Sequence, residues 1–359
     1  MQKKLRLLLI ISILLMQTAY SKSIPLDNKN IHVIGAVYIL RSPTKLFYKR
    51  FSEKILNMSD SVKMFNTYTA ETTSGIIIEF KTNSSFTHFT FSPEPGGNEG
   101  GFFRVLKDGA ELKTVSFRTP VTQNVQISLD SLSSEKEAVY QIILPSYSNL
   151  SLTNFEIDDN SNLVTYTPAK RKIYLGFGDS ITHGRGQGGS SYFTYPFLLS
   201  QKLDMNLYNL AIGGSKVSIP IAEMSKDLPK ADVITILIGY NDFNGASHTL
   251  ERFEKDYREF LSIIRKNQPK AKIFCINLLY TKKKENQHTH LTPEDFRHVI
   301  EKVVTEYQAS ENKLFLIKGD QITSAENLQP GLKTDAVHLT VKGAQLFADA
   351  LYKEMAKFL

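Results

Sequence analysis

The sequence predicts two domains of different architecture: an amino-terminal antiparallel β-sandwich and a carboxy-terminal α/β/α domain with a five-stranded parallel sheet. Short β-type runs separated by turn residues fill residues 30–165. From residue 168 onward, apolar strands alternate with amphipathic helices. The length of 359 residues, with 42% hydrophobic and 22% charged residues, is typical of a globular protein of about two domains.

The amino-terminal half, residues 30–165, contains β-type runs and no long helical pattern. The runs are "HVIGAVYIL", "SGIIIEFK", "FTHFTF", "GFFRVLK", "AELKTVSF", "VQISL", "VYQIIL" and "LSLTNFEI". Asp108-Gly109 separates two of them and is a strong hairpin signal. The pattern predicts an antiparallel β-sandwich of the jelly-roll type.

The carboxy-terminal half, residues 168–359, has the rhythm of a parallel sheet. Its expected strands are "KIYLGF", "LYNLAI", "VITILIG", "KIFCINLL" and "KLFLIKG". Its expected helices lie near residues 191–203, 250–267, 293–308 and 340–358. Apolar strands joined by helices predict a parallel sheet between two helical layers. Such sheets bind ligands beyond the carboxyl ends of their strands.

The amino terminus has the pattern of an export signal. Three basic residues precede "LLLIISILLM", which is too short to span a bilayer, and Ala19 and Ser21 are small residues suited to cleavage. We therefore expect a signal peptide over residues 1–21 and a periplasmic or secreted protein without stable membrane association after signal removal. The alternative is an uncleaved amino-terminal anchor.

The net charge argues against a nucleic-acid-binding protein, and the single cysteine is expected in the core. The formal charge is +7, and loss of the three signal cations leaves a mild +4. The basic run Lys282–Lys284 is interpreted as a solvated loop, so we expect no nucleic-acid partner. Cys275 lies in the apolar run "KIFCINLL", where a core residue is expected.

Polar residues follow the predicted strands. Ser180 follows the first strand, in "YLGFGDSITHG", where it could cap a helix or serve as a nucleophile. Gly214 and Asn241 follow the next two strands. Each of the two could belong to a turn or could donate a hydrogen bond to an oxyanion, and both alternatives are open at this point. Asp335 and His338 are three residues apart just before the last helix, a spacing at which a carboxylate can reach the histidine Nδ1.

The combination resembles the SGNH hydrolase superfamily, also called GDSL-type esterases. Its four blocks appear as "GDSIT", "NLAIGG", "GYND" and "DAVH", and the match spans nearly all of residues 172–359. The resemblance implies that Ser180 is the nucleophile and also an oxyanion donor. It implies that Gly214 and Asn241 complete the oxyanion hole, and that Asp335 and His338 complete the triad.

Two further features refine the resemblance. Ile181 stands where the name-giving motif has Leu, a frequent variant, and the absence of G-x-S-x-G around Ser180 argues against the α/β-hydrolase fold. A β-sandwich directly before "GDSITHG" resembles the two-domain acetyl esterases of carbohydrate esterase family 2. His183 and Tyr192 are candidate substrate contacts, whereas His288 and His290 are interpreted as loop residues and not metal ligands.

These features predict an exported serine esterase that removes short acyl groups, above all acetyl, from carbohydrate. The expected partner is the acylated carbohydrate substrate, and no metal or organic cofactor is needed. Two alternatives stay open: a lipid-directed esterase such as a lysophospholipase on the same triad, and a glycan-binding protein with an inactive triad.

Overall fold

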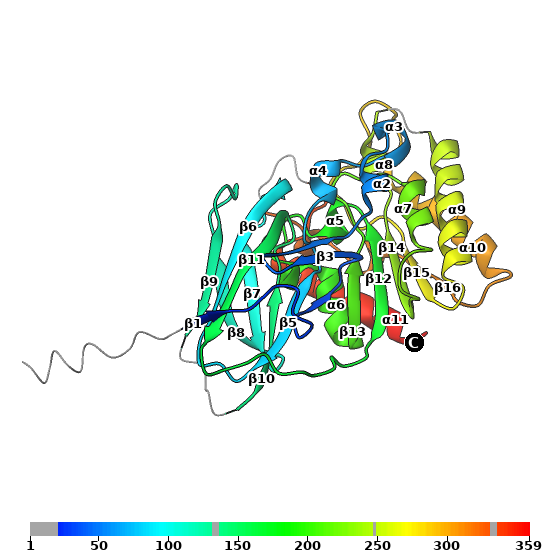
Figure 1. Cartoon of the computed structure of the whole chain (residues 1–359). Coiled ribbons are helices and arrows are strands. Elements are labelled where there is room, and N and C mark those ends of the chain that lie inside the picture. The colour runs from blue at the N-terminus through cyan, green and yellow to red at the C-terminus, as the bar shows by residue number, and fades with distance from the viewer. Residues whose placement is uncertain (1–20, 131–135, 247–248, 331–335) are drawn as a thin grey trace, which may run out of the picture.

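The computed structural model describes residues 21–130, 136–246, 249–330 and 336–359. Figure 1 shows a β-rich amino-terminal half packed against a half in which helices flank a parallel sheet. The predicted signal peptide, residues 1–21, lies outside the described residues apart from its last residue. Within the described ranges, no helix has both the length and the apolar character needed to cross a membrane.

Two antiparallel sheets form the amino-terminal half. The first has the order β3-β4-β11-β6-β9 with β1 on β11, and the second β2-β5-β10-β7-β8. The strands of the first sheet are β1 (Ser21–Ser23), β3 (Tyr38–Ser42), β4 (Lys45–Lys49), β6 (Thr87–Asn98), β9 (Val125–Leu129) and β11 (Ser148–Asp158). Those of the second are β2 (His32–Ile34), β5 (Ile77–Thr82), β7 (Phe102–Lys107), β8 (Ala110–Ser116) and β10 (Ala138–Ile143). The β-rich half is thus confirmed, whereas the jelly-roll type stays a prediction.

The two sheets share one core. Phe80 of the second sheet packs on Phe89 and Phe155 of the first, with ring centroids 5.5 and 4.9 Å away. The predicted hairpin at Asp108-Gly109 joins β7 to β8, and both residues have positive φ, as a tight hairpin turn requires. The first sheet starts before the expected boundary at residue 30, because Ser21–Ser23 pairs with β11.

Two details of the amino-terminal half differ from the prediction. The run "HVIGAVYIL" is not one strand: β2 and β3 belong to different sheets, and Gly35 between them has a φ of +84°. Three short helices, α2 (Glu53–Leu56), α3 (Asp60–Lys63) and α4 (Thr67–Ala70), were not predicted, since four residues are too few for a helical stripe. Phe51, Ile55 and Phe65 in this segment pack into the core of the carboxy-terminal half.

The carboxy-terminal half contains the predicted five-stranded parallel sheet, in the order β13-β12-β14-β15-β16. Its strands are β12 (Lys172–Gly178), β13 (Met205–Asn209), β14 (Val233–Leu237), β15 (Lys272–Ile276) and β16 (Leu314–Ile317). The main helices are α6 (Tyr195–Leu203), α7 (Ile219–Met224), α9 (Leu250–Asn267), α10 (Pro293–Gln308) and α11 (Val341–Ala356). Of these, α7 was not predicted.

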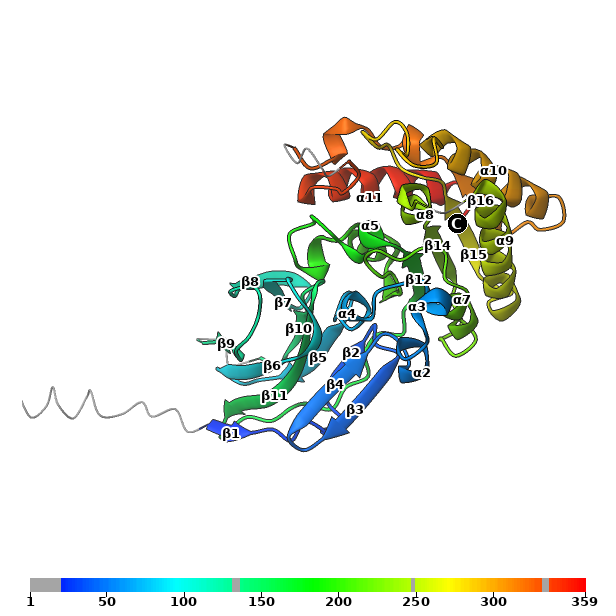
Figure 2. The same cartoon turned by 90° about the horizontal axis from the view of Figure 1, so that it is seen from above.

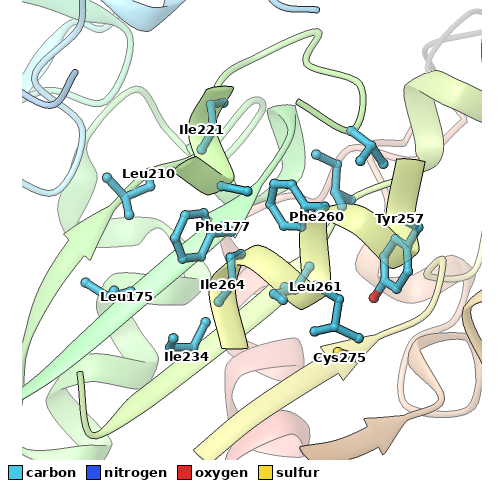
Figure 3. Packing of buried hydrophobic residues seen from close by; sticks show 14 of the residues in the cluster. Leu175, Phe177, Leu210, Ile221, Ile234, Tyr257, Phe260, Leu261, Ile264 and Cys275 are labelled. Carbon is cyan, nitrogen blue, oxygen red and sulfur yellow. The ribbon is translucent and has the colours of Figure 1, made fainter. Parts of the chain in front are cut away.

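Helices cover both faces of this sheet. The apolar residues of α6 and α11 pack on one face, and those of α7, α9 and α10 on the other. Figure 3 shows Phe177 and Cys275 of the sheet against Phe260 and Ile264 of α9. Cys275 is fully buried, as expected of a core residue.

The strand order determines where loops converge. The chain passes from β12 to β13 on one side and then to β14 on the other side of β12. In a doubly wound sheet, ligands bind at the carboxyl ends where the strand order reverses in this way. Figure 2 shows the short helices α2, α3 and α4 lying between the β-rich half and α7, and Figure 1 shows α3 and α4 near α5 and α8, the helices that follow β12 and β14.

Candidate active site

Ser180 and His338 are in direct contact. The Nε2 atom of His338 lies 2.8 Å from the Oγ atom of Ser180, although 158 residues separate them. Both side chains are partly exposed, so a ligand can reach the pair. A hydroxyl this close to an imidazole nitrogen can transfer its proton to that nitrogen. Asp335, the predicted third member, lies outside the described residues, and its role stays a prediction.

Local geometry explains why Ser180 stands at the strand end. β12 ends at Gly178, where a Cβ atom would lie only 2.6 Å from the carbonyl oxygen of Leu237. Asp179 then caps α5 (Ser180–His183), its Oδ1 accepting the Ile181 N–H at 3.0 Å. Ser180 is therefore the first residue of the helix, and its N–H has no hydrogen-bond partner among the described residues.

The turn after β13 leaves one donor available. Five neighbouring N–H groups donate hydrogen bonds, those of Leu210 to Gly176, Ala211 to the Asn209 side chain, Ile212 to Gly178, Gly213 to the His183 side chain, and Ser215 to Ile212. The N–H of Gly214 has no such partner in the described part of the chain. Gly214 has a φ of +81°, and nothing lies within 4 Å of the place a Cβ would take. Its N–H can therefore bind an incoming oxygen.

Asn241 follows the third strand. Gly239, with a φ of +126°, turns the chain from β14 into α8 (Tyr240–Asn244). The Asn241 Nδ2 donates to the Ser215 carbonyl at 2.9 Å, which ties the amide to the turn that contains Gly214. An amide nitrogen carries two protons, so the second can serve another acceptor.

Two buried carboxylates support the loops. Burial raises the pKa of Asp179 to about 7 and the pKa of Asp242 to about 7. Asp242 accepts the Val217 N–H at 3.2 Å, downstream of the Gly214 turn. Both residues therefore hold backbone N–H groups in place.

The expectation that His183 contacts substrate is corrected. Its ring is fully buried and stacks on Tyr147 with centroids 4.0 Å apart. The Nδ1 accepts the Gly213 N–H at 3.0 Å, and the Nε2 lies 2.8 Å from both the Ser146 carbonyl oxygen and Thr72 Oγ1. His183 lies behind the Gly214 turn and is shielded from solvent.

Tyr192 lies at the junction of the two halves. Its ring, half-buried in a 3₁₀ turn, packs 5.0 Å from the Arg104 guanidinium of β7 and 5.5 Å from the Phe197 ring. A substrate contact at Tyr192 stays a prediction.

The amino-terminal half adds surfaces that the sequence did not reveal. A hollow of about 480 Å³ lies next to Gly214, and its walls are Asp60, Met64, Phe65, Asn66, Thr67, Gly214 and Lys216. Glu99 forms an ion pair with Arg185, whose N–H donates to the Ser180 carbonyl. The guanidinium of Arg185 lies 5.6 Å from the Tyr147 ring. Both halves therefore border the Ser180 site.

Comparisons with known proteins agree with this architecture. Residues 177–346 match the GDSL-like Lipase/Acylhydrolase family. The Cellulase/esterase CelE of Acetivibrio thermocellus is 23% identical over 211 residues, which cover 48% of this chain and 25% of CelE. The chain spans a quarter or less of the length of the curated relatives it matches.

Solved structures extend the likeness to both halves. The salicylyl-acyltransferase SsfX3 from a tetracycline biosynthetic pathway has a TM-score of 0.81 at 21% identity, covering 95% of this chain and 98% of that protein. A family two carbohydrate esterase from Clostridium thermocellum, solved with cellohexaose, has a TM-score of 0.62 at 18% identity, covering 80% and 93%. At these identities the likeness concerns the fold. Residues 177–346 of this chain are thus similar to the GDSL-like Lipase/Acylhydrolase family, and the likeness of fold extends over both halves.

Proposed function

We propose that this protein is an exported serine esterase that removes acetyl and other short acyl groups from carbohydrate. The observation that carries the proposal is the 2.8 Å contact between His338 and Ser180, beside the unpartnered N–H groups of Ser180 and Gly214 in the described structure. A nucleophile, a base and oxyanion donors are the parts that ester hydrolysis needs.

The mechanism follows from these parts. Ser180 Oγ attacks the ester carbonyl while His338 Nε2 takes its proton, and the same proton then goes to the departing sugar oxygen, which leaves as a hydroxyl. His338 then takes a proton from water as the water attacks the acyl-enzyme, and it gives this proton to Ser180 Oγ as the carboxylic acid leaves. Asp335 is proposed to hold the His338 ring and to stabilise its protonated form.

The oxyanion of each tetrahedral intermediate is proposed to accept hydrogen bonds from the Ser180 and Gly214 N–H groups and from the Asn241 amide. Donors fixed before the reaction stabilise developing charge without reorganisation, and one such donor is typically worth about 10²–10³ in kcat. The bond from Asn241 Nδ2 to Ser215 supports this role because it fixes the amide in advance.

The polar surroundings favour a sugar over a lipid chain. The hollow beside Gly214 has a carboxylate, an amide, a hydroxyl and an ammonium group among its walls, from Asp60, Asn66, Thr67 and Lys216. The wall that contains Met64 is bonded to the loop after Gly214, since the Lys216 N–H donates to the Met64 carbonyl oxygen at 3.1 Å. A hydroxylated ring can exchange hydrogen bonds with such walls, whereas an alkyl chain cannot.

The test is the dependence of kcat/KM on acyl length, measured with p-nitrophenyl acetate, butyrate, octanoate and palmitate. We expect the acetate to be cleaved best and kcat/KM to drop steeply beyond the butyrate. A lipid-directed enzyme gains up to about 0.8 kcal/mol for each buried CH₂ group, so its profile would climb with length. A rise to octanoate or beyond would replace the carbohydrate assignment with the lipid one.

A further inference from the structure

The turn that carries Gly214 is held from behind by the amino-terminal half. Thr69 of α4 donates through Oγ1 to the Gly213 carbonyl oxygen at 2.9 Å, and the Asn66 carbonyl oxygen, at 3.1 Å, is a second acceptor for the same proton. His183 accepts the Gly213 N–H at 3.0 Å. Both hydrogen-bonding groups of Gly213 are therefore occupied, one by each half of the molecule.

The Thr69 bond also sets the direction of the Gly214 N–H. The carbonyl of Gly213 and the N–H of Gly214 belong to one planar trans peptide, in which they point in opposite directions. With the carbonyl oxygen bound to Thr69 on one side, the N–H projects to the other, where the described chain offers it no partner. Rotation of this peptide would break the bond to Thr69.

His183 is fixed in one tautomer. A backbone N–H can only donate, so Nδ1 must carry the lone pair that accepts the Gly213 N–H. The Nε2 proton then faces the Ser146 carbonyl oxygen and Thr72 Oγ1, each 2.8 Å away. Burial lowers the pKa of His183, and the charge of Arg50 lowers it further, so the neutral ring is favoured.

Arg50, from the amino-terminal half, forms hydrogen bonds to the same turn. Its side chain is 1% exposed, and its Nη1 donates to the carbonyl oxygens of Asn209 at 2.9 Å and Ala211 at 2.6 Å. Its Nε donates to the Thr72 carbonyl and its Nη2 to Thr72 Oγ1. No carboxylate of the described residues pairs with Arg50. The buried charge of its guanidinium is therefore compensated only by carbonyl and hydroxyl oxygens, and these oxygens must stay in place.

We infer that Thr69, His183 and Arg50 are positioning residues, which lock the peptide between Gly213 and Gly214 so that the Gly214 N–H is preorganised for the oxyanion. The inference rests on the proposed oxyanion role of Gly214. It assigns a catalytic contribution to the amino-terminal half, which supplies Thr69 and Arg50. None of the three residues contacts the substrate in this account.

The test is Thr69→Val, which removes the hydroxyl and keeps the shape of the side chain. Thr153→Val is the matched control, because Thr153 is also half-buried and also bonds a carbonyl, that of Thr90 at 3.2 Å within the first sheet. Thr69→Ser is the rescue variant. Each variant is assayed with p-nitrophenyl acetate well below its Tm, and its inhibition by a boronic acid, which forms a tetrahedral adduct with a serine, is measured.

We expect Thr69→Val to lower kcat about 10-fold or more with KM changed less than about 2-fold, because misdirection of one donor forfeits part of the roughly 10²–10³ that a donor supplies. Boronate affinity should fall with kcat, the Tm should fall no further than in Thr153→Val, and Thr69→Ser should restore most of the rate. A Thr69→Val enzyme with kcat close to that of wild type would overturn the inference. Ser180→Ala in the same assay tests the proposed function separately, since retained turnover there would refute that function whatever Thr69 does.

Discussion

Replacement of Asn241 by alanine separates a catalytic amide from a structural one. The side chain lies in α8 and donates one hydrogen bond, to the Ser215 carbonyl at 2.9 Å. Loss of an ordinary hydrogen bond costs about 1 kcal/mol, which in a chain of this size lowers Tm by roughly 1–2 °C. Loss of an oxyanion donor costs about 2.7–4 kcal/mol of transition-state stabilisation, or roughly 10²–10³ in kcat.

The two roles therefore predict different readouts. We expect Asn241→Ala to lose about 10²–10³ in kcat on p-nitrophenyl acetate, with little change in KM and a small fall in Tm. Asn244→Ala is the matched control, since Asn244 ends the same helix, is exposed and bonds only the Lys283 side chain among the described residues. Unchanged kcat in Asn241→Ala together with a lowered Tm would refute the oxyanion reasoning and leave Asn241 a structural residue.

Three other predictions concern the pair, the buried acid and the domain junction. Ser180→Ala and His338→Ala should each lose at least about 10³ in kcat, and the double variant should be little worse, because the two act as one unit; single variants that keep a tenth of the rate would contradict the pairing. Burial raises the pKa of Asp179 from 3.8 to about 7, so the native state binds more protons than the unfolded state in this interval and stability falls as pH rises through it. Asp179→Asn, which keeps the helix cap, should flatten this decline in Tm across that interval, and an equally steep decline would count against a raised pKa. Residues 167–359 expressed alone should be poorly soluble or less stable, since they lose Arg50 and the apolar side chains around it, and a soluble piece with full activity and an unchanged melting profile would disprove this.

The parallel sheet and the order of the strand ends were predictable from the sequence. Apolar runs of strand length alternate with helical stripes, and this rhythm determines a doubly wound sheet. Because parallel strands point the same way, residues that follow successive strands gather at one edge of the sheet, and Ser180, Gly214 and Asn241 are expected to lie together there. The contact of Ser180 with His338 places the segment just before α11 at the same edge.

The support behind the site could not be predicted, because its partners are far apart in the chain. Arg50 meets Ala211 across 161 positions, and Thr72 meets His183 across 111. Nothing in local sequence distinguishes a buried arginine bound to carbonyls from an exposed one. His183 had the spacing of a pocket residue, and only its burial shows that it faces Gly213 instead.

The short helices from Glu53 to Ala70 escaped prediction for a related reason. Each has four residues, and only Ile55, Leu56 and Ala70 of the three helices belong to the carboxy-terminal core, so the helices show neither a helical nor a strand period of their own. The split of "HVIGAVYIL" into β2 and β3 depends on Gly35, where a Cβ would lie 2.5 Å from the Gly75 carbonyl oxygen. A tertiary contact, invisible in the sequence, decides that break.

The most direct test of the central claim is the release of acetate from acetylated polysaccharide, compared between the wild-type enzyme and Ser180→Ala. We predict continuous acetate release by the wild-type enzyme and none above background by Ser180→Ala at the same concentration and with the same fold by circular dichroism. Equal release by both proteins would contradict the assignment of Ser180, and absence of release by the wild-type enzyme, alongside cleavage of lysophospholipids, would contradict the carbohydrate assignment.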